Sequence, residues 1–121
     1  MDKVILVIDD DQDFQMILKI SLPKCGFVVR SVFDGLVSDL LMEEPVPDVI
    51  LLDIDLPVAN GVDVCKRIKA NAATRNIPVI MVSANPYVDQ LSKQVGARDY
   101  VQKPFTLQAL LEKVNASLVN S

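Results

Sequence analysis

The chain has 121 residues, half of them apolar, with a formal net charge of −4 and no histidine. This length suits a single domain whose core needs no disulfide or metal for stability. The acidic balance argues against nucleic-acid binding, which requires a basic face. Because histidine is absent, any bound metal is expected to be a hard cation held by oxygen atoms.

Cysteine usage and hydropathy favour a cytoplasmic protein with no membrane partner. Cys25 and Cys65 match no zinc or redox spacing, so they are expected to be reduced and largely packed. No apolar stretch approaches the roughly 20 residues of a membrane span, and no signal sequence precedes the first apolar run.

Short aliphatic runs alternate with stretches of helical spacing along the chain. The runs predict strands at about residues 3–8, 27–32, 48–52, 77–82 and 99–102. Because the runs are continuous, they indicate a parallel sheet buried on both faces. Three apolar stripes predict helices between or after the strands: Phe14, Ile17, Leu18 and Leu22; Val62, Cys65 and Ile68; and Leu107, Leu110, Leu111, Val114 and Leu118.

Residues suited to helix ends flank these stripes. Pro23 conflicts with the first helix and is expected to kink or shorten it. The predicted caps are Asp11 or Asp13 and Thr106 at amino ends, and Gly26 and Gly96 at carboxyl ends.

Five strands, each followed by a helix, predict an α/β fold of (βα)5 type. Right-handed crossovers then require an open, doubly wound parallel sheet with helices on both faces. Periodicity does not fix the strand order. In the common flavodoxin-like order 2-1-3-4-5, the crevice lies between strands 1 and 3, which end on Asp9-Asp10 and on Asp53.

Charged and polar side chains at the predicted strand ends favour metal and phosphate chemistry. Asp9, Asp10 and Asp11 repel one another unless a cation offsets their charge. Asp53 suits a metal ligand, a strand terminator or a nucleophile toward phosphorus. A Mg²⁺ ion bound there would neutralise the charge that repels an incoming phosphoryl group. Lys103 offers a point charge to such a group, and Ser83 offers a hydroxyl donor.

Taken together, these motifs resemble the receiver domain of two-component response regulators, of the single-domain chemotaxis-regulator kind. The resemblance spans essentially all of residues 1–121, which are expected to form one receiver domain. It rests on residues 7–11 (VIDDD), 51–57 (LLDIDLP), 60–61 (NG), 78–84 (PVIMVSA) and 96–105 (GARDYVQKPF).

The resemblance implies a role for each motif residue. Asp53 would accept a phosphoryl group from a histidine kinase or phosphotransfer protein, and the domain would be a phosphoacceptor rather than an enzyme. Asp9, Asp10, Asp53 and the backbone carbonyl of Asp55 would hold Mg²⁺. Ser83 and Lys103 would bind the phosphoryl oxygens, and the Lys103–Pro104 peptide would be cis.

The resemblance also implies a switch. Tyr100 would change rotamer together with Ser83 when Asp53 is phosphorylated. The face formed by the fourth helix, the fifth strand and the last helix, roughly residues 86–118, would then change its affinity for an output partner or a second copy of the chain. The sequence does not indicate which kinase phosphorylates the domain or which output it controls.

The chain departs from the family's usual sequence at two positions, and two alternative functions stay open. The family often has aspartate where this chain has Asn60, and Asp55 is an extra acid beside Asp53. Asp53 and Asp55 also resemble the DxD signature of haloacid-dehalogenase-like phosphatases, although that motif normally follows the first strand. A second alternative is a pseudo-receiver that binds partners without phosphoryl transfer. The 121 residues suit either a complete protein or a receiver within a longer regulator or hybrid kinase.

Overall fold

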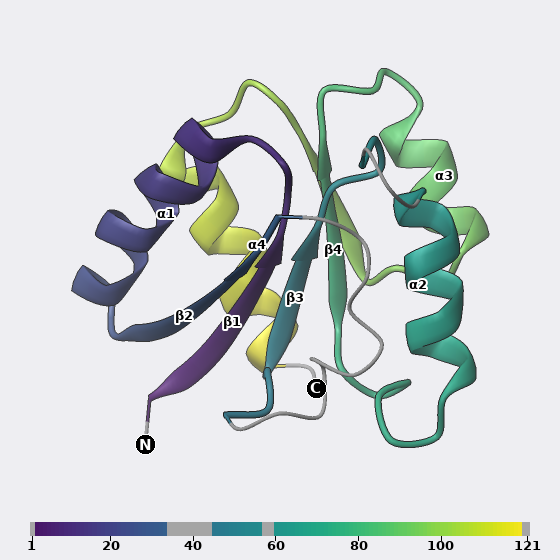
Figure 1. Cartoon of the computed structure of the whole chain (residues 1–121), viewed down its shortest axis with the longest axis horizontal. Helices are drawn as coiled ribbons and strands as arrows, with labels where there is room; N and C mark the ends of the chain where they lie inside the picture. The colour runs from purple at the N-terminus through teal and green to yellow at the C-terminus, as the bar shows by residue number, and fades with distance from the viewer. Residues whose placement is uncertain (1, 34–44, 57–59, 120–121) are drawn as a thin grey trace.

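The structure, a computed structural model, describes residues 2–33, 45–56 and 60–119. Within them lies one five-stranded parallel sheet of order β2-β1-β3-β4-β5 (Figure 1). The predicted strand order is therefore confirmed. The strands are β1 (Lys3–Ile8), β2 (Phe27–Val32), β3 (Val49–Leu52), β4 (Val79–Ser83) and β5 (Asp99–Gln102).

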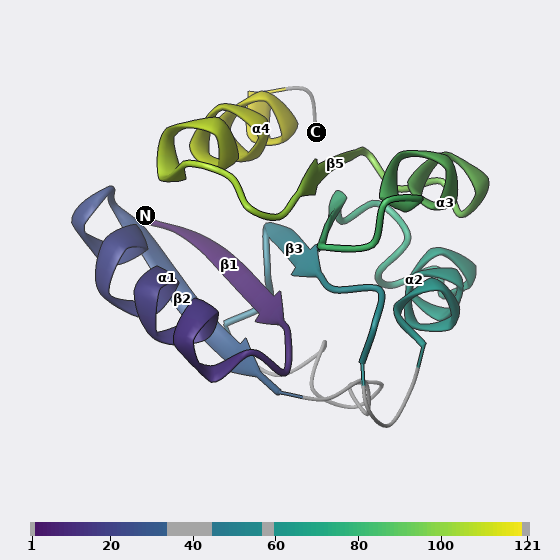
Figure 2. The ribbon, with the colours of Figure 1, turned by 90° about the horizontal axis from the view of Figure 1, so that it is seen from above.

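Helices cover both faces of this sheet, as a doubly wound fold requires. When the structure is seen from above, α1 and α4 lie on one face, and α2 and α3 lie on the other (Figure 2). The helix predicted between β2 and β3 falls outside the described residues. The described helices are α1 (Gln12–Lys24), α2 (Gly61–Ala70), α3 (Val88–Gln94) and α4 (Leu107–Val119).

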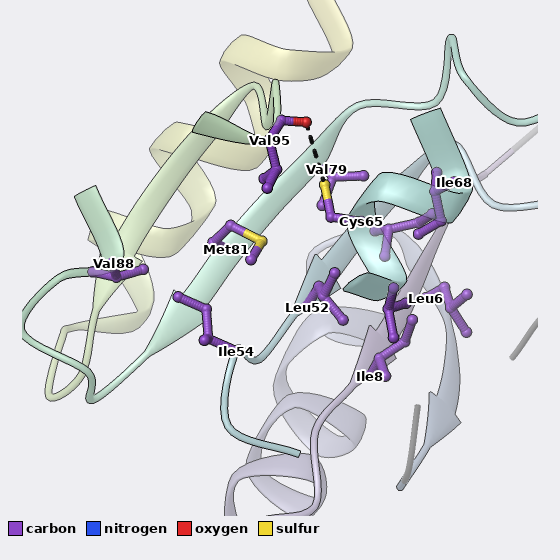
Figure 3. Close-up of a cluster of buried hydrophobic side chains, with 12 residues drawn as sticks. Leu6, Ile8, Leu52, Ile54, Cys65, Ile68, Val79, Met81, Val88 and Val95 are labelled. Atoms are coloured by element: carbon purple, nitrogen blue, oxygen red, sulfur yellow. Dashed lines mark hydrogen bonds between the residues drawn. The ribbon is translucent and has the colours of Figure 1, made fainter. Parts of the chain in front are cut away.

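Two aliphatic cores result from the alternation of side chains along each strand. On β1, Leu6 and Ile8 face α2 and α3, whereas Ile5 and Val7 face α1 and α4. Figure 3 shows the first core, where the Cys65 thiol donates to the carbonyl of Val95 at 3.9 Å. The central strands β1, β3 and β4 are buried on both faces, and almost none of their side chains is exposed.

The helix caps agree with the sequence. Asp11, not Asp13, caps α1, since its Oδ1 accepts from the amide of Phe14 at 3.1 Å. Thr106 Oγ1 accepts from the amide of Ala109 at 3.1 Å at the start of α4. Gly26 and Gly96 have φ angles of +91° and +76°, which favour glycine at these helix ends.

Three expectations need correction or refinement. Cys25 is exposed, because it lies at the carboxyl cap of α1. Ile17 is 57% exposed and lies outside the buried stripe of α1; Gln15 is buried in its place. Pro23 sits in the last turn of α1, which ends one residue later at Lys24.

Within the described residues, no helix is long and apolar enough to cross a bilayer.

Candidate functional site

The carboxyl ends of four strands meet at one edge of the sheet, uppermost in Figure 1. Asp9 follows β1, Asp53 follows β3, Ser83 ends β4 and Lys103 follows β5. Ladder hydrogen bonds continue past the strand ends: the Asp53 amide donates to Ile8 at 2.9 Å, and the Lys103 amide donates to the Ser83 carbonyl at 2.8 Å. The sheet itself therefore fixes the spacing of these residues.

Three carboxylates gather at this edge. Asp9, Asp10 and Asp53 each place an oxygen within 4.8 Å of the other two. Asp9 and Asp53 are 1% and 7% exposed, whereas Asp10 is open to solvent. Asp11 takes no part in this cluster, because its side chain caps α1. A group of oxygen ligands with one open side is suited to a hard divalent cation.

Lys103 offsets part of this negative charge. Its Nζ lies 2.7 Å from Asp9 Oδ2, and it also lies 4.3 Å from the centre of the Phe14 ring. Asp9 Oδ1 accepts from the amide of Asp11 at 2.9 Å. Burial raises the pKa of Asp9, and the contacts with Lys103 and the Asp11 amide oppose that rise. The Lys103–Pro104 peptide is cis, as expected.

Three neighbouring groups compensate in part for the burial of Asp53. Its Oδ1 accepts from the amide of Asp55 at 3.2 Å. Burial raises the pKa of Asp53, while the Asp55 amide, the Ser83 hydroxyl and the Lys103 charge oppose the rise. Loss of solvent thus dominates at this carboxylate, so a cation or a further hydrogen-bond donor would stabilise its charged form.

The start of α2 packs directly against the main chain at Asp53. A Cβ atom on Gly61 would lie only 2.0 Å from the Asp53 carbonyl oxygen, so only glycine fits. The Gly61 amide donates to the carbonyl of Ile54 at 2.8 Å. Asn60 caps α2 by accepting from the amide of Val62 at 2.8 Å. The departure at Asn60 therefore leaves a functional helix cap and does not alter the carboxylate cluster.

Ser83 and Tyr100, the two residues expected to switch, lie on neighbouring strands but at different positions along the strand direction. Ser83 is fully buried, and its Oγ accepts from the amide of Asn85 at 3.1 Å. Tyr100 is half-buried and pairs in register with Met81, two residues before Ser83. The Lys113 ammonium lies 5.4 Å from the centre of the Tyr100 ring.

Asp9, Asp10, Asp53, Ser83 and Lys103 thus share one site, while the exposed Asp55 contributes its amide and Tyr100 lies deeper along β5. One buried residue beside the site escaped the sequence analysis. Gln15 contacts the main chain of Asp9 from α1. Its position three residues before Leu18 and seven before Leu22 was the available signal, since these spacings share one helix face.

Comparison with known proteins identifies this arrangement. A family model for the response regulator receiver domain matches residues 5–115. The chain belongs to this family. It is 35% identical over 119 residues to the DNA-binding dual master transcriptional regulator RpaA of Synechocystis, covering 94% of this chain and 48% of that protein. The chain therefore spans about half the length of this curated relative.

Solved receiver structures have the same fold. A crystal structure assigned to the response regulators, from Chloroflexus aurantiacus, superimposes with a TM-score of 0.90 at 27% identity, over 98% of this chain and 99% of that one. The signal receiver domain of a histidine kinase from Syntrophus aciditrophicus gives a TM-score of 0.86 at 27% identity, over 98% and 91%.

As a response regulator receiver domain, the chain is a signalling module. The phosphatase alternative finds no support, since Asp53 follows the third strand in sequence and not the first.

Proposed function

We propose that residues 1–121 act as one receiver module whose phosphoacceptor is Asp53. The observation that carries this assignment is the placement of its carboxylate: 7% exposed, within 4.8 Å of oxygens from Asp9 and Asp10. In the transfer, an Asp53 carboxylate oxygen would form a bond to phosphorus as the bond from phosphorus to a donor histidine breaks. The donor would be a histidine kinase or a phosphotransfer protein.

The donor atoms of the site fit Mg²⁺. All three converging side chains are carboxylates, and burial has raised the pKa of two of them, so a divalent cation would offset a real electrostatic cost. Asp9, Asp10 and Asp53 would hold the ion, with the backbone carbonyl of Asp55 as a further ligand. When bound, the ion would supply neutralising charge at the phosphoryl oxygens.

Lys103 and Ser83 would bind the phosphoryl oxygens. Lys103 is 2.7 Å from Asp9 and 18% exposed, so its ammonium already lies inside the site. Ser83 follows four buried residues of β4 and has its hydroxyl at the same edge. A phosphoryl group carries up to two negative charges and three strong acceptor oxygens, which both donors would satisfy.

A change at Ser83 would reach the surface through Tyr100. The face formed by α3, β5 and α4 would then shift between two states that differ in affinity for an output protein or domain, or for a second copy of the chain. This use as a signalling module, without turnover of a substrate, is consistent with a cytoplasmic protein and with no nucleic-acid contact by the receiver itself.

The test is phosphate incorporation by intact mass, with acetyl phosphate as donor and with Mg²⁺ or EDTA. Wild type should gain one phosphoryl group only with Mg²⁺, and Asp53→Asn should gain none. Asp55→Asn is the matched control, because Asp55 is an exposed aspartate in the same loop and should leave labelling intact. Full labelling of Asp53→Asn would refute the assignment, and no labelling of wild type would favour the pseudo-receiver alternative.

A further inference from the structure

Gln15 is a polar residue on the buried face of α1. Its side chain is 2% exposed, on the face that also carries Leu18 and Leu22. Buried amides are normally retained for the hydrogen bonds they form, because removing an amide from water costs free energy. The contacts of Gln15 therefore indicate what it does.

All of those contacts come from its amide nitrogen. Nε2 lies 3.0 Å from the carbonyl oxygen of Val7, 3.1 Å from that of Asp9 and 2.9 Å from that of Val32. Two hydrogens are thus shared among three acceptors. Its Oε1 is buried and has no partner in the part of the chain that the structure describes. The opposite amide orientation would set Oε1 against three acceptors, so the contacts themselves fix this orientation.

These bonds enclose the main chain of Asp9. The Val32 carbonyl that accepts from Gln15 also accepts from the Asp9 amide, at 3.0 Å. The Asp9 carbonyl belongs to the peptide that leads into Asp10. Gln15 therefore holds the Val7–Ile8 and Asp9–Asp10 peptides directly, and it reaches the Asp9 amide through the Val32 carbonyl at the end of the edge strand β2.

We infer that Gln15 is a positioning residue for the carboxylate cluster. It holds the Asp9 main chain and the Asp9–Asp10 peptide, so that both carboxylates point toward Asp53. An apolar residue of the same size would fill the space but leave these carbonyls without the amide donor. This inference rests on the proposed Mg²⁺ site, because its main consequence is for metal affinity.

The experiment compares wild type with Gln15→Met, which preserves side-chain length. The Mg²⁺ dissociation constant of the folded protein is measured by isothermal titration calorimetry. We expect it to rise about 10–100-fold, the usual effect of losing a group that orients metal ligands. In EDTA, amide exchange at Asp9 and Asp11 should accelerate more than exchange at the central-strand residue Leu51.

Two controls separate positioning from packing. Gln12→Met makes the same change at an exposed position of α1, and Ser31→Ala removes a hydroxyl that has no partner in the described residues. Both should keep the wild-type affinity. If Gln15→Met does not fold, Gln15→Asn, which keeps a shorter amide, undergoes the same titration and must also bind more weakly.

The outcomes are distinguishable. Wild type that binds no Mg²⁺ would refute the proposed metal site. Wild type that binds, with Gln15→Met binding equally well, would overturn the role of Gln15 alone. Lower stability of Gln15→Met in urea with unchanged affinity would show that the residue only supports the fold.

Discussion

Replacing Asp53 with asparagine should stabilise the metal-free protein at neutral pH. Asparagine keeps an oxygen that accepts from the Asp55 amide, so the change removes charge while preserving that contact. The oxygens of Asp9 and Asp53 lie within 4.8 Å of each other. Two unit charges at that distance repel by about 1 kcal/mol in water and by about 3.5 kcal/mol at an effective dielectric constant of 20. Because Lys103 offsets part of this, we expect a gain of about 1–2 kcal/mol.

The gain should depend on pH with a defined sign. Burial raises the pKa of Asp53 above its ordinary value of 3.8, so the folded state binds the proton more tightly than the unfolded state. The stability contributed by the protonated form is fully present below 3.8 and is lost as pH rises through the folded pKa. Asparagine mimics the protonated form, so its advantage should be complete above the folded pKa and should shrink as pH falls toward 3.8.

Circular dichroism measures the difference in stability between the variant and wild type, with unfolding by urea for the free energy and by heat for the melting temperature. In EDTA at about pH 8 the variant should be more stable, and its melting temperature should rise by about 3–5 °C per kcal/mol for a chain of this size. Saturating Mg²⁺ should narrow or reverse this difference in stability, because the ion stabilises the folded form of the protein that binds it more tightly, which is wild type. A variant less stable than wild type in EDTA at pH 8, or a gain independent of pH, would refute the electrostatic reasoning. Asp55→Asn, at an exposed position, should show no comparable gain.

Two other substitutions test neighbouring contacts. Lys103→Met should lower stability in EDTA by about 2–3 kcal/mol, because it leaves the buried Asp9 carboxylate without its ammonium partner, and it should tighten Mg²⁺ binding by removing a competing cation. Lys93→Met, in an exposed pair with Asp89, should cost less than about 1 kcal/mol; an equal loss in both variants would contradict a special role for Lys103. Gly61→Ala should cost about 1–3 kcal/mol and shift the amide resonances of Asp53 and Ile54, since its Cβ would lie 2.0 Å from the Asp53 carbonyl oxygen. Unchanged resonances there would contradict the close approach.

The sheet was predictable because its central strands leave little room for another interpretation. Continuous runs such as residues 49–52 are buried on both faces, and that burial requires helices on both sides. The polar residues at the strand ends were predictable for the same reason, since a charge directly after a buried strand marks the edge of the sheet. Strand order was not readable from periodicity, and the order 2-1-3-4-5 was expected because it is a common one for small doubly wound sheets.

Other features depend on contacts that a hydrophobic pattern does not encode. Gln15 is buried because backbone carbonyls satisfy it, so a search for apolar spacing selected Ile17 in its place. The close approach of Gly61 to Asp53 depends on how α2 meets the end of β3. The pairing of Lys103 with Asp9, residues 94 positions apart, depends on the sheet order that places β1 and β5 around the same edge.

That last pairing bears on how a phosphoryl group would be sensed. The Lys103 ammonium lies 2.7 Å from Asp9, a residue that we propose as a metal ligand. The two cations would therefore compete for one carboxylate. A metal at Asp9 would weaken the hold on Lys103, and a phosphoryl group on Asp53 would offer the ammonium new acceptors close by. The Lys103 amide also donates to the carbonyl of Ser83, so movement of either residue would displace the other. Metal binding and phosphorylation should thus act in the same direction on the end of β5.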